Sequence, residues 1–454
     1  MRIDRIDLWH VAVPLPAAFH PSWIPGFTQR ENRFDLVRLT TASGIEGWSA
    51  APAMARERAG WGGLLGSYFL GERADDLANL RQRIREMGYL GHRAGWIEPA
   101  VWDILGKARR VPVHELLGGR GGEVELYAST GEMRSGAARI EEVQARIAEG
   151  FEAVKLRVHE VSLEQDLAQL RETRRGVGDE VELGVDANMG WRVAALADAP
   201  RWTFDRALAF CKEAENLGFA WVEEPLAMDD YSGLAKLRAA TSIAIAGGEL
   251  NGHGLPEFKI MIEKGCYDWY QPDAVMIGGI GETWAVVQHA TSAGAHYTPH
   301  TWTNGIGFAI NLQIFAASPQ REEHRLEYPY DPPGWVPEGR DGLLVEPWFH
   351  EKGTLRIPDA PGLGFEIDAR ALRRWGRRYY TATPLRVAVA TVLDRGLKEA
   401  KSLGAVRGER LAARSSSLDG ELASGADPSL EALQALLPTQ GEAGGSAACS
   451  GSED

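Results

Sequence analysis

Three short stretches of the chain decide its fold: VELGVDAN (residues 181–188), AWVEEP (220–225) and IAIAGGE (243–249). Each contains an apolar run of strand length that stops at a carboxylate side chain. The segments between them have helical apolar spacing, as in FDRALAFCKEAENLG (204–218). Strands that alternate with helices in this way are predicted to lie parallel in one sheet, joined by right-handed crossovers.

The same rhythm continues outward on both sides. Two further runs precede these stretches and three follow: VELYAST (124–130), EAVKLRV (152–158), DWYQPDA (268–274), AHYTPH (295–300) and HRLEYP (324–329). Consecutive polar residues near the ends of these runs, from Lys155 to Glu327, lie 24 to 37 positions apart. Eight such units predict an α/β fold with a (β/α)8 barrel of the TIM type. A doubly wound open sheet is the alternative, but no G-x-G-x-x-G motif follows any candidate strand.

The extent of the alternating strand and helix patterns divides the chain into four parts. Residues 1–122 mix alternating strand patterns with helical spacing, and the barrel is expected over residues 123–355. Residues 356–383 still have the composition of an ordered segment. Residues 384–454 are predicted to begin as a peripheral helix and to become a disordered tail beyond about Arg414, because Ser, Gly, Ala and Glu dominate there.

Composition excludes several classes of protein. The 454 residues include 49 basic and 63 acidic side chains, a net charge of −14, which argues against nucleic-acid binding. The three cysteines, Cys211, Cys266 and Cys449, are too scattered for a disulfide framework or a cysteine zinc site. The first residues lack the apolar core of a signal peptide, and no run approaches the ~18 apolar residues of a membrane span. We therefore expect a cytoplasmic enzyme that contacts neither nucleic acid nor membrane.

Asp186, Glu223 and Glu249 end three successive predicted strands. Side chains at the carboxyl ends of barrel strands converge on one mouth, so these carboxylates are expected to lie close together. Unpaired carboxylates repel one another, and a divalent cation relieves that repulsion. An all-oxygen ligand set favours Mg²⁺. Glu224 directly follows Glu223, and alternation along the strand sends the two to different sides without deciding which one faces the ion.

The other strand ends carry candidates for proton transfer. His300 has an ordinary pKa near ~6.5, suited to moving protons at neutral pH, and Asp273 on the preceding strand can hydrogen-bond its ring. Lys155 and Arg157 are two positions apart on the second predicted strand, so they point the same way. If they face the barrel interior, they lie across the mouth from His300. The alternative is a salt bridge to a neighbouring helix.

With these residues in place, the chain resembles the enolase superfamily, in its mandelate racemase subgroup. The resemblance covers roughly residues 1 to 380. The motifs that carry it are WDILGKARRVPVHELLGG, AVKLRV, VDANMGW, WVEEPL, GGE, QPDAVMIGG, PHTW, VPEGRDGLL and IPDAPGLGFEID, in that order. The resemblance implies an N-terminal α+β capping domain over residues 1–122 and a C-terminal segment, residues 356–383, that returns to this cap.

The resemblance also implies roles for individual residues. It makes Asp186, Glu223 and Glu249 the Mg²⁺ ligands, and it makes Asp273 and His300 an acid–base dyad.

Three further residues of the chain have roles by the same resemblance. Glu327 is similar to the acid that hydrogen-bonds the substrate carboxylate as it becomes an enolate, and Asn188 to a residue that contacts substrate. Lys155 resembles the first lysine of a Lys-x-Lys pair. The second position of that pair is Arg157, a departure from the family pattern, and a guanidinium rarely gives up its proton.

This departure favours one-sided chemistry over two-base racemisation. The implied reaction is Mg²⁺-dependent abstraction of the α-proton of a hydroxy acid by His300, followed by loss of the β-hydroxyl, which turns a sugar acid into a 2-keto-3-deoxy acid. Lys155 is the alternative base, since burial beside Arg157 would lower its pKa. Racemisation, epimerisation and cycloisomerisation remain alternatives within the superfamily, and a non-catalytic barrel that binds a metal or ligand is the alternative outside it.

The substrate is expected to meet loops of the cap. The loop AFHPSWIPGFTQRENR (18–33) carries His20 and Arg30, whose polar groups suit a hydroxylated acid better than an aryl acid. The expected partner is thus a small-molecule carboxylate, and the family suggests a homo-oligomer.

Overall fold

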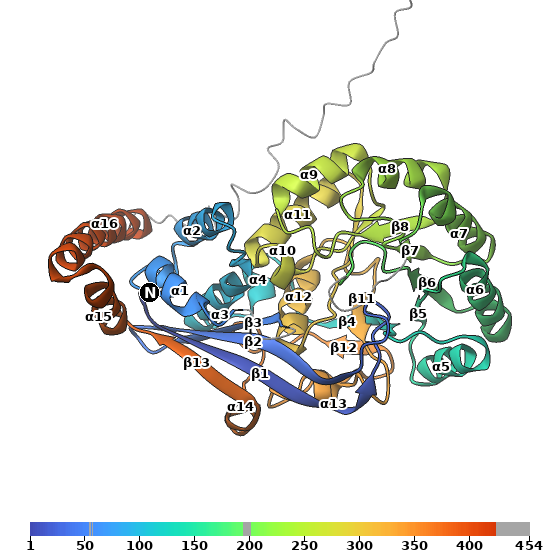
Figure 1. The fold of residues 1–454 in the computed structure, drawn as a ribbon, viewed down its shortest axis with the longest axis horizontal. Helices are drawn as coiled ribbons and strands as arrows, with labels where there is room; N and C mark the ends of the chain where they lie inside the picture. Colours follow the sequence, from blue (N-terminus) through green and yellow to red (C-terminus); the bar gives the residue numbers. More distant parts are fainter. Residues whose placement is uncertain (54–55, 57, 194–200, 424–454) are drawn as a thin grey trace, which may run out of the picture.

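The computed structural model describes residues 1–53, 56, 58–193 and 201–423. Figure 1 shows two parts side by side: a barrel of parallel strands with helices around it, and a long antiparallel sheet with helices packed on it. The predicted (β/α)8 barrel with an N-terminal α+β cap is confirmed. The doubly wound alternative is wrong, because the last barrel strand pairs with the first.

Eight parallel strands form the barrel in their sequence order. Their bounds are β4 (Glu123–Ser129), β5 (Ala153–Arg157), β6 (Glu182–Asp186), β7 (Trp221–Glu223), β8 (Ala244–Gly247), β9 (Trp269–Tyr270), β10 (His296–Tyr297) and β11 (Leu326–Pro329). β11 returns to β4, with Leu326 opposite Leu126 and Glu327 opposite Tyr127. This pairing brings the two ends of the barrel sequence together.

The β10–β11 seam is held differently from the other neighbouring pairs. In the described part of the chain, the strand ladder runs from β10 around the ring to β11 without a backbone pairing between these two. Two threonine hydroxyls bridge them instead: Thr298 Oγ1 donates to the carbonyl of Arg325 at 2.9 Å, and Thr301 Oγ1 donates to the carbonyl of Glu327 at 2.9 Å.

Helices follow most of the barrel strands and cover the outside of the ring (Figure 1). Their bounds are α5 (Gly136–Ala148), α6 (Leu163–Val177), α7 (Phe204–Asn216), α8 (Tyr231–Ala240), α9 (Leu255–Lys264), α10 (Ala274–Ile277), α11 (Ile280–Ser292), α12 (Gly305–Ala317) and α13 (Pro337–Arg340). Gly150 and Gly218 follow the ends of α5 and α7 at φ 97° and 66°, the left-handed conformation expected of residues that stop a helix. After α13, β12 (Thr354–Arg356) adds to β4 antiparallel.

Aromatic side chains fill the barrel interior below the mouth. Tyr127, Trp221 and Trp269 pack together, with ring centroids 5.2 Å apart in both pairs that involve Trp221. Gly184 on β6 has no room for a side chain, because the Trp221 ring occupies that space. The polar residues above therefore rest on a dry floor, where charges interact strongly.

The cap is built on a four-stranded antiparallel sheet in the order β13-β1-β2-β3. Its strands are β1 (Ile3–Phe19), β2 (Gln29–Thr41), β3 (Glu46–Pro52) and β13 (Gly376–Ala382). Its helices are α1 (Trp61–Phe69), α2 (Leu77–Tyr89), η1 (Gly95–Ile97), α3 (Glu98–Arg109) and α4 (Val113–Leu116). A further helix, α14 (Ala369–Trp375), lies in the segment that leads back to the cap sheet. β13 comes from the far end of the sequence and pairs with β1, so a C-terminal segment completes the N-terminal sheet.

Buried polar contacts fix the cap against the barrel. Glu98 at the start of α3 accepts hydrogen bonds from the backbone N–H groups of Ile280 at 2.7 Å and Gly281 at 3.1 Å. These are otherwise unpaired donors of the first turn of α11, so the carboxylate caps a helix of the other domain. The cap is thereby held in a fixed position relative to the barrel strands that carry the site.

Two helices extend beyond the cap sheet: α15 (Pro384–Arg395) and α16 (Leu397–Ala423). The expectation that order ends at about Arg414 is wrong, since α16 continues to Ala423. The sequence pattern misses the cause, which is a row of arginines that binds the cap: Arg410 contacts Glu72 at 2.5 Å and Arg414 contacts Asp76 at 2.7 Å. The remainder of the predicted disordered tail, residues 424–454, lies outside the described residues.

Candidate active site

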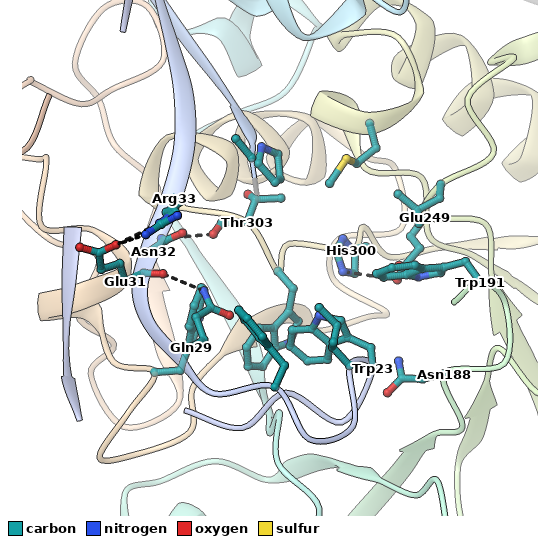
Figure 2. Close-up of a pocket in the computed structure, with 18 of the residues that line it drawn as sticks. Trp23, Gln29, Glu31, Asn32, Arg33, Asn188, Trp191, Glu249, His300 and Thr303 are labelled. Carbon is teal, nitrogen blue, oxygen red and sulfur yellow. Dashed lines mark hydrogen bonds and ion pairs between the residues drawn. The ribbon is translucent and has the colours of Figure 1, made fainter. Parts of the chain in front are cut away.

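A cavity of about 980 Å³ opens where the carboxyl ends of the barrel strands face the cap. In Figure 2, Glu249, His300 and Trp191 border it on the barrel side, and Gln29 and Arg33 border it on the cap side. Beneath these residues lie the other polar side chains of the strand ends. The site therefore has a wall from each domain, as ligand sites at domain interfaces commonly do.

The three carboxylates at the ends of β6, β7 and just after β8 are buried at the mouth. Asp186 and Glu223 are at most 1% exposed, and Glu249 is 6% exposed. Each is oriented by a neutral donor: the backbone N–H of Asn188 donates to Asp186 at 2.7 Å, Gln271 Nε2 to Glu223 at 2.8 Å, and Trp191 Nε1 to Glu249 at 2.9 Å. Such donors hold carboxylates in fixed orientations.

Lys155 and Arg157 face the barrel interior from β5. Lys155 Nζ lies 2.7 Å from Glu223 Oε1 and 2.6 Å from Glu327 Oε1, while the guanidinium of Arg157 binds Asp186. Burial alone lowers the pKa of Lys155, but the two carboxylates outweigh burial and raise it above its ordinary value. The expected lowering of this pKa is wrong, and Lys155 stays protonated, which disfavours it as the base.

His300 and Asp273 form a hydrogen-bonded pair on the opposite side of the mouth. His300 Nδ1 donates to Asp273 Oδ2 at 2.9 Å, and Asn311 Nδ2 donates to the other oxygen of Asp273, also at 2.9 Å. His300 Nε2 is thus left toward the cavity, 3.3 Å from Glu249 Oε2. Burial lowers the pKa of His300, but Glu249 and Asp273 outweigh it and raise the pKa to about 10.

Glu327 on β11 joins the two sides of the mouth. Besides its contact with Lys155, it accepts hydrogen bonds from Ser129 Oγ at 2.8 Å and from the backbone N–H of Thr301 at 2.6 Å. Burial raises its pKa, but Lys155 and His300 lower it to about 2. Glu327 is therefore ionised and firmly held at neutral pH.

Negative charge is in excess at this mouth. Six buried carboxylates face two permanent cations and His300; the carboxylates are Asp186, Glu223, Glu224, Glu249, Asp273 and Glu327. Burial, with Glu223 and Glu249, raises the pKa of Asp186 to about 7. Glu224, at φ 48°, is turned against Gly190, and its Oε2 is buried with no hydrogen-bond partner among the described residues. A divalent cation is the partner that this charge distribution and this set of oxygens fit.

The carboxylates are not yet gathered as tightly as an ion requires. Within the described residues, the oxygens of Asp186, Glu223 and Glu249 do not all lie within 4.8 Å of one another. Two ion pairs explain this spread, because Arg157 binds Asp186 and His300 contacts Glu249. Cation binding by all three requires these two positively charged groups to withdraw from the carboxylates.

Two of the residues predicted to contact substrate line the cavity, one from the cap and one from the barrel. Arg30 and Asn188 line the cavity, and Asn188 is held by Ser22 Oγ at 2.7 Å. His20 does not reach the cavity: its side chain is 58% exposed and faces Glu132. The prediction that His20 binds substrate is therefore wrong, because β1 ends at Phe19 and the chain turns His20 outward.

The aromatic side chains that border the site are not predicted from the sequence. Phe19 and Trp23 of the cap pack on Trp302 and Trp335 of the barrel, and the guanidinium of Arg157 lies 5.3 Å from the ring centroids of both Trp23 and Trp302. Trp302 belongs to the motif PHTW, so a signal was present, but it did not indicate a role.

Four polar positioning residues were also missed: Ser129, Trp191, Gln271 and Asn311. Ser129 ends β4, Gln271 directly follows β9 and Trp191 lies in the loop after β6, places where a polar residue is a detectable signal. Asn311 lies in the middle of α12, a helix in which almost every residue is buried, and nothing in its spacing marks it.

Comparison with known proteins agrees with this architecture. Residues 6–118 match the family model of the mandelate racemase / muconate lactonizing enzyme N-terminal domain, and residues 138–371 match that of the enolase C-terminal domain-like family. The match to the second model covers the barrel strands from β5 to β11 and every candidate metal-ligating and proton-transferring residue.

Among similar proteins, a D-galactarolactone cycloisomerase from Agrobacterium fabrum is 30% identical over 76% of this chain and 93% of its own length. An arabinonate dehydratase from Saccharolobus solfataricus is 30% identical over 60% of this chain and 68% of its own. A solved racemase from Streptomyces coelicolor A3(2) with bound magnesium has a TM-score of 0.70 at 24% identity, covering 83% of this chain and 100% of the other.

The family matches span both domains, the relatives align over most of their own lengths, and the fold has the cap, barrel and returning strand that the resemblance implied. The chain therefore belongs to the enolase superfamily, in its mandelate racemase subgroup.

Proposed function

We propose that this protein is a Mg²⁺-dependent hydro-lyase that removes water from a sugar acid to give a 2-keto-3-deoxy acid. The observation that carries this proposal is the arrangement of His300: its Nδ1 is held by Asp273, and its Nε2 faces the cavity beside Glu249. Its substrate would be a small carboxylate in the cytoplasm, and the working unit a homo-oligomer. In the described part of the chain, no helix is long and apolar enough to cross a membrane.

Asp186, Glu223 and Glu249 would hold the Mg²⁺ ion. When bound, it supplies positive charge that stabilises the carboxylate of the substrate as that group becomes an enolate. The same charge compensates Glu249, which otherwise raises the pKa of His300. We expect metal loading to bring His300 from an imidazolium toward the neutral form that a base requires.

Proton transfer is then carried by one residue. Neutral His300 takes the α-proton at Nε2, and Asp273 stabilises the imidazolium through Nδ1. The electron pair of the broken C–H bond enters the enolate. As the enolate collapses, the β-hydroxyl leaves with the proton of His300 as water, and the resulting enol tautomerises to the 2-keto acid.

The opposite side of the mouth supplies fixed positive charge. Lys155 and Arg157 are both buried, and carboxylates raise the pKa of each. They can neutralise the developing negative charge of the enolate, but they cannot take a proton at neutral pH. This asymmetry favours a reaction that begins and ends on the side of His300.

A second candidate, cycloisomerisation of a ring-form sugar acid, is favoured by one observation. Five aromatic side chains line the cavity: Trp23, Phe27, Trp191, Trp302 and Trp335. Flat aromatic faces suit the C–H faces of a cyclic substrate, and a relative that is 30% identical is named as a cycloisomerase. Both reactions share the abstraction of the α-proton, so they differ only in the group that leaves.

The test incubates the purified protein with a panel of open-chain and lactone acid sugars in D₂O, with Mg²⁺ or with EDTA. Mg²⁺-dependent release of a 2-keto-3-deoxy acid supports dehydration, and Mg²⁺-dependent ring opening without net loss of water supports cycloisomerisation. Absence of both products and of α-deuterium incorporation across the panel would refute the enzymatic reading in favour of a non-catalytic barrel.

A further inference from the structure

Two histidines and a glutamate meet at the end of the barrel opposite to the mouth. His296 begins β10, and His324 precedes β11 by two residues, so both lie at the amino ends of strands. His296 Nδ1 and His324 Nε2 are 2.8 Å apart. With a carboxylate oxygen of Glu323, they form a group whose three atoms all lie within 4.8 Å of one another. We call these three residues the rim site.

The protein backbone around the rim site is held in place by side chains. Gln320 accepts a hydrogen bond from the N–H of Tyr297 at 3.0 Å and donates to the carbonyl of Ala295 at 3.2 Å, so it grips the backbone on both sides of His296. The ring of His324 packs edge-on against Trp269, with centroids 5.3 Å apart. The two imidazoles are therefore positioned by the fold before any ligand arrives.

The surroundings of the rim site are acidic. Arg325, next to His324 in the chain, forms ion pairs with three glutamates of other strands or their approaches: Glu125 at 3.3 Å, Glu152 at 2.8 Å and Glu182 at 2.6 Å. Three carboxylates on one guanidinium leave net negative charge, which attracts cations to this end of the barrel.

We propose that the rim site binds a divalent transition metal of the Zn²⁺ class. Two imidazole nitrogens and one carboxylate oxygen form a ligand set that suits zinc and its neighbours, whereas Mg²⁺ prefers oxygen alone. Zn–N distances of about 2.0–2.1 Å in a tetrahedral site place two nitrogens roughly 3.3 Å apart, so the histidines need to separate by about half an ångström. Glu323 is exposed and both histidines are half-buried, which leaves the fourth position open to water.

The position of the rim site gives the metal a structural consequence. His296 belongs to β10 and His324 to the approach to β11, the two strands that lack a backbone ladder in the described structure. A metal held by both residues closes this seam at the end of the barrel away from the catalytic mouth. Because it binds only the folded barrel, it also raises the stability of that state.

The test titrates the full-length protein with ZnCl₂ in saturating Mg²⁺ and records heat of binding and the melting temperature. We expect one Zn²⁺ per chain at the rim site and a higher melting temperature in wild type and in the control Glu322→Gln, an exposed neighbour outside the group. His296→Ala and His324→Ala should each lower zinc affinity by more than the ~10- to 100-fold that loss of a metal-orienting residue costs. Glu323→Gln should lower it by less.

Two further measurements keep the result decisive. His296→Gln and His324→Gln retain polar side chains and serve if an alanine variant fails to fold, and Co²⁺ in place of Zn²⁺ reports tetrahedral nitrogen ligation by its visible absorption. Zinc binding of unchanged stoichiometry and affinity in the histidine variants overturns the proposal, as does a wild-type protein that takes up no zinc while Mg²⁺ is present. In the second case the two histidines form only a hydrogen bond.

Discussion

The two sides of the barrel mouth carry positive charge in different ways. On the β5 side, Lys155 and Arg157 are locked onto buried carboxylates and keep their protons. On the β9–β10 side, His300 has a dedicated orienting partner, Asp273, and a nitrogen that faces the cavity. One mouth can therefore combine permanent positive charge, which stabilises an enolate, with a single exchangeable proton.

The largest effect is expected from His300→Asn. This change removes the only group at the mouth assigned to proton transfer, so turnover should fall by about 10²- to 10⁴-fold. Mg²⁺ affinity, measured by calorimetry, should change little, because the carboxylates remain. His20→Asn is the matched control, since His20 faces Glu132 outside the cavity, and should keep wild-type turnover. Equal losses in the two variants would show that His300 has no special role.

The pKa of His300 should respond strongly to the metal. Glu249 and Asp273 raise this pKa to about 10, so the imidazole beside them is charged throughout the neutral range. Added Mg²⁺ compensates Glu249, and we expect the pKa to fall toward its ordinary value near ~6.5. Titration of the His300 ring by NMR, with and without Mg²⁺, measures the shift. A pKa that stays in place would mean that the ion binds away from Glu249.

Asp273→Asn should lower turnover by about 100-fold, because the imidazole loses the acceptor that fixes its orientation and tautomer. Since Asp273 acts through His300, the informative reading is the pH profile of kcat/KM. Its acidic limb, where His300 loses its proton to become the base, should move to lower pH, because a carboxylate that raised the pKa of His300 is gone. A variant with reduced kcat and an unshifted profile would point to a purely structural defect.

Arg157→Lys tests the other side of the comparison directly. The substitution keeps the charge but loses the fork of hydrogen bonds to Asp186 and the Thr130 carbonyl, so turnover should fall about tenfold. A lysine can release a proton where a guanidinium cannot. Deuterium from D₂O should therefore enter the α-position with the opposite stereochemistry in the variant, detected by NMR of recovered substrate. Its absence would mean that the asymmetry does not depend on the residue at position 157.

The smallest effect is expected from Trp191→Phe. This variant keeps the aromatic wall of the cavity and removes only the indole N–H that donates to Glu249. The Mg²⁺ affinity should fall severalfold, up to about tenfold, as expected from the ~0.5–1.5 kcal/mol net contribution of one hydrogen bond. Trp61→Phe, in α1 of the cap, is the control. Mg²⁺ affinity equal to that of the control would remove Trp191 from the orientation of Glu249.

Much of the architecture could be predicted because barrel strands repeat at regular intervals. Asp186, Glu223 and Glu249 stop three such strands, and that position alone places them at one mouth. Asn311 could not be found in this way, since it acts from the interior of a buried helix. His20 was misjudged because a loop sequence contains no information on which side chains turn inward.

The direction of the pKa shift of Lys155 could not be predicted from the sequence either. Spacing shows that Lys155 and Arg157 share a face, but the sign of the shift depends on how many carboxylates each one touches. The length of α16 was underestimated for a related reason, because its stability comes from ion pairs with residues more than 300 positions away.

The pairing of β13 with β1 has a consequence for synthesis in the cell. One edge of the first strand waits for residues 376–382, which the ribosome adds only after the whole barrel has been made. At about 5–20 residues per second, this delay is on the order of tens of seconds. Throughout that time the nascent chain exposes an unpaired edge that neighbouring chains can join.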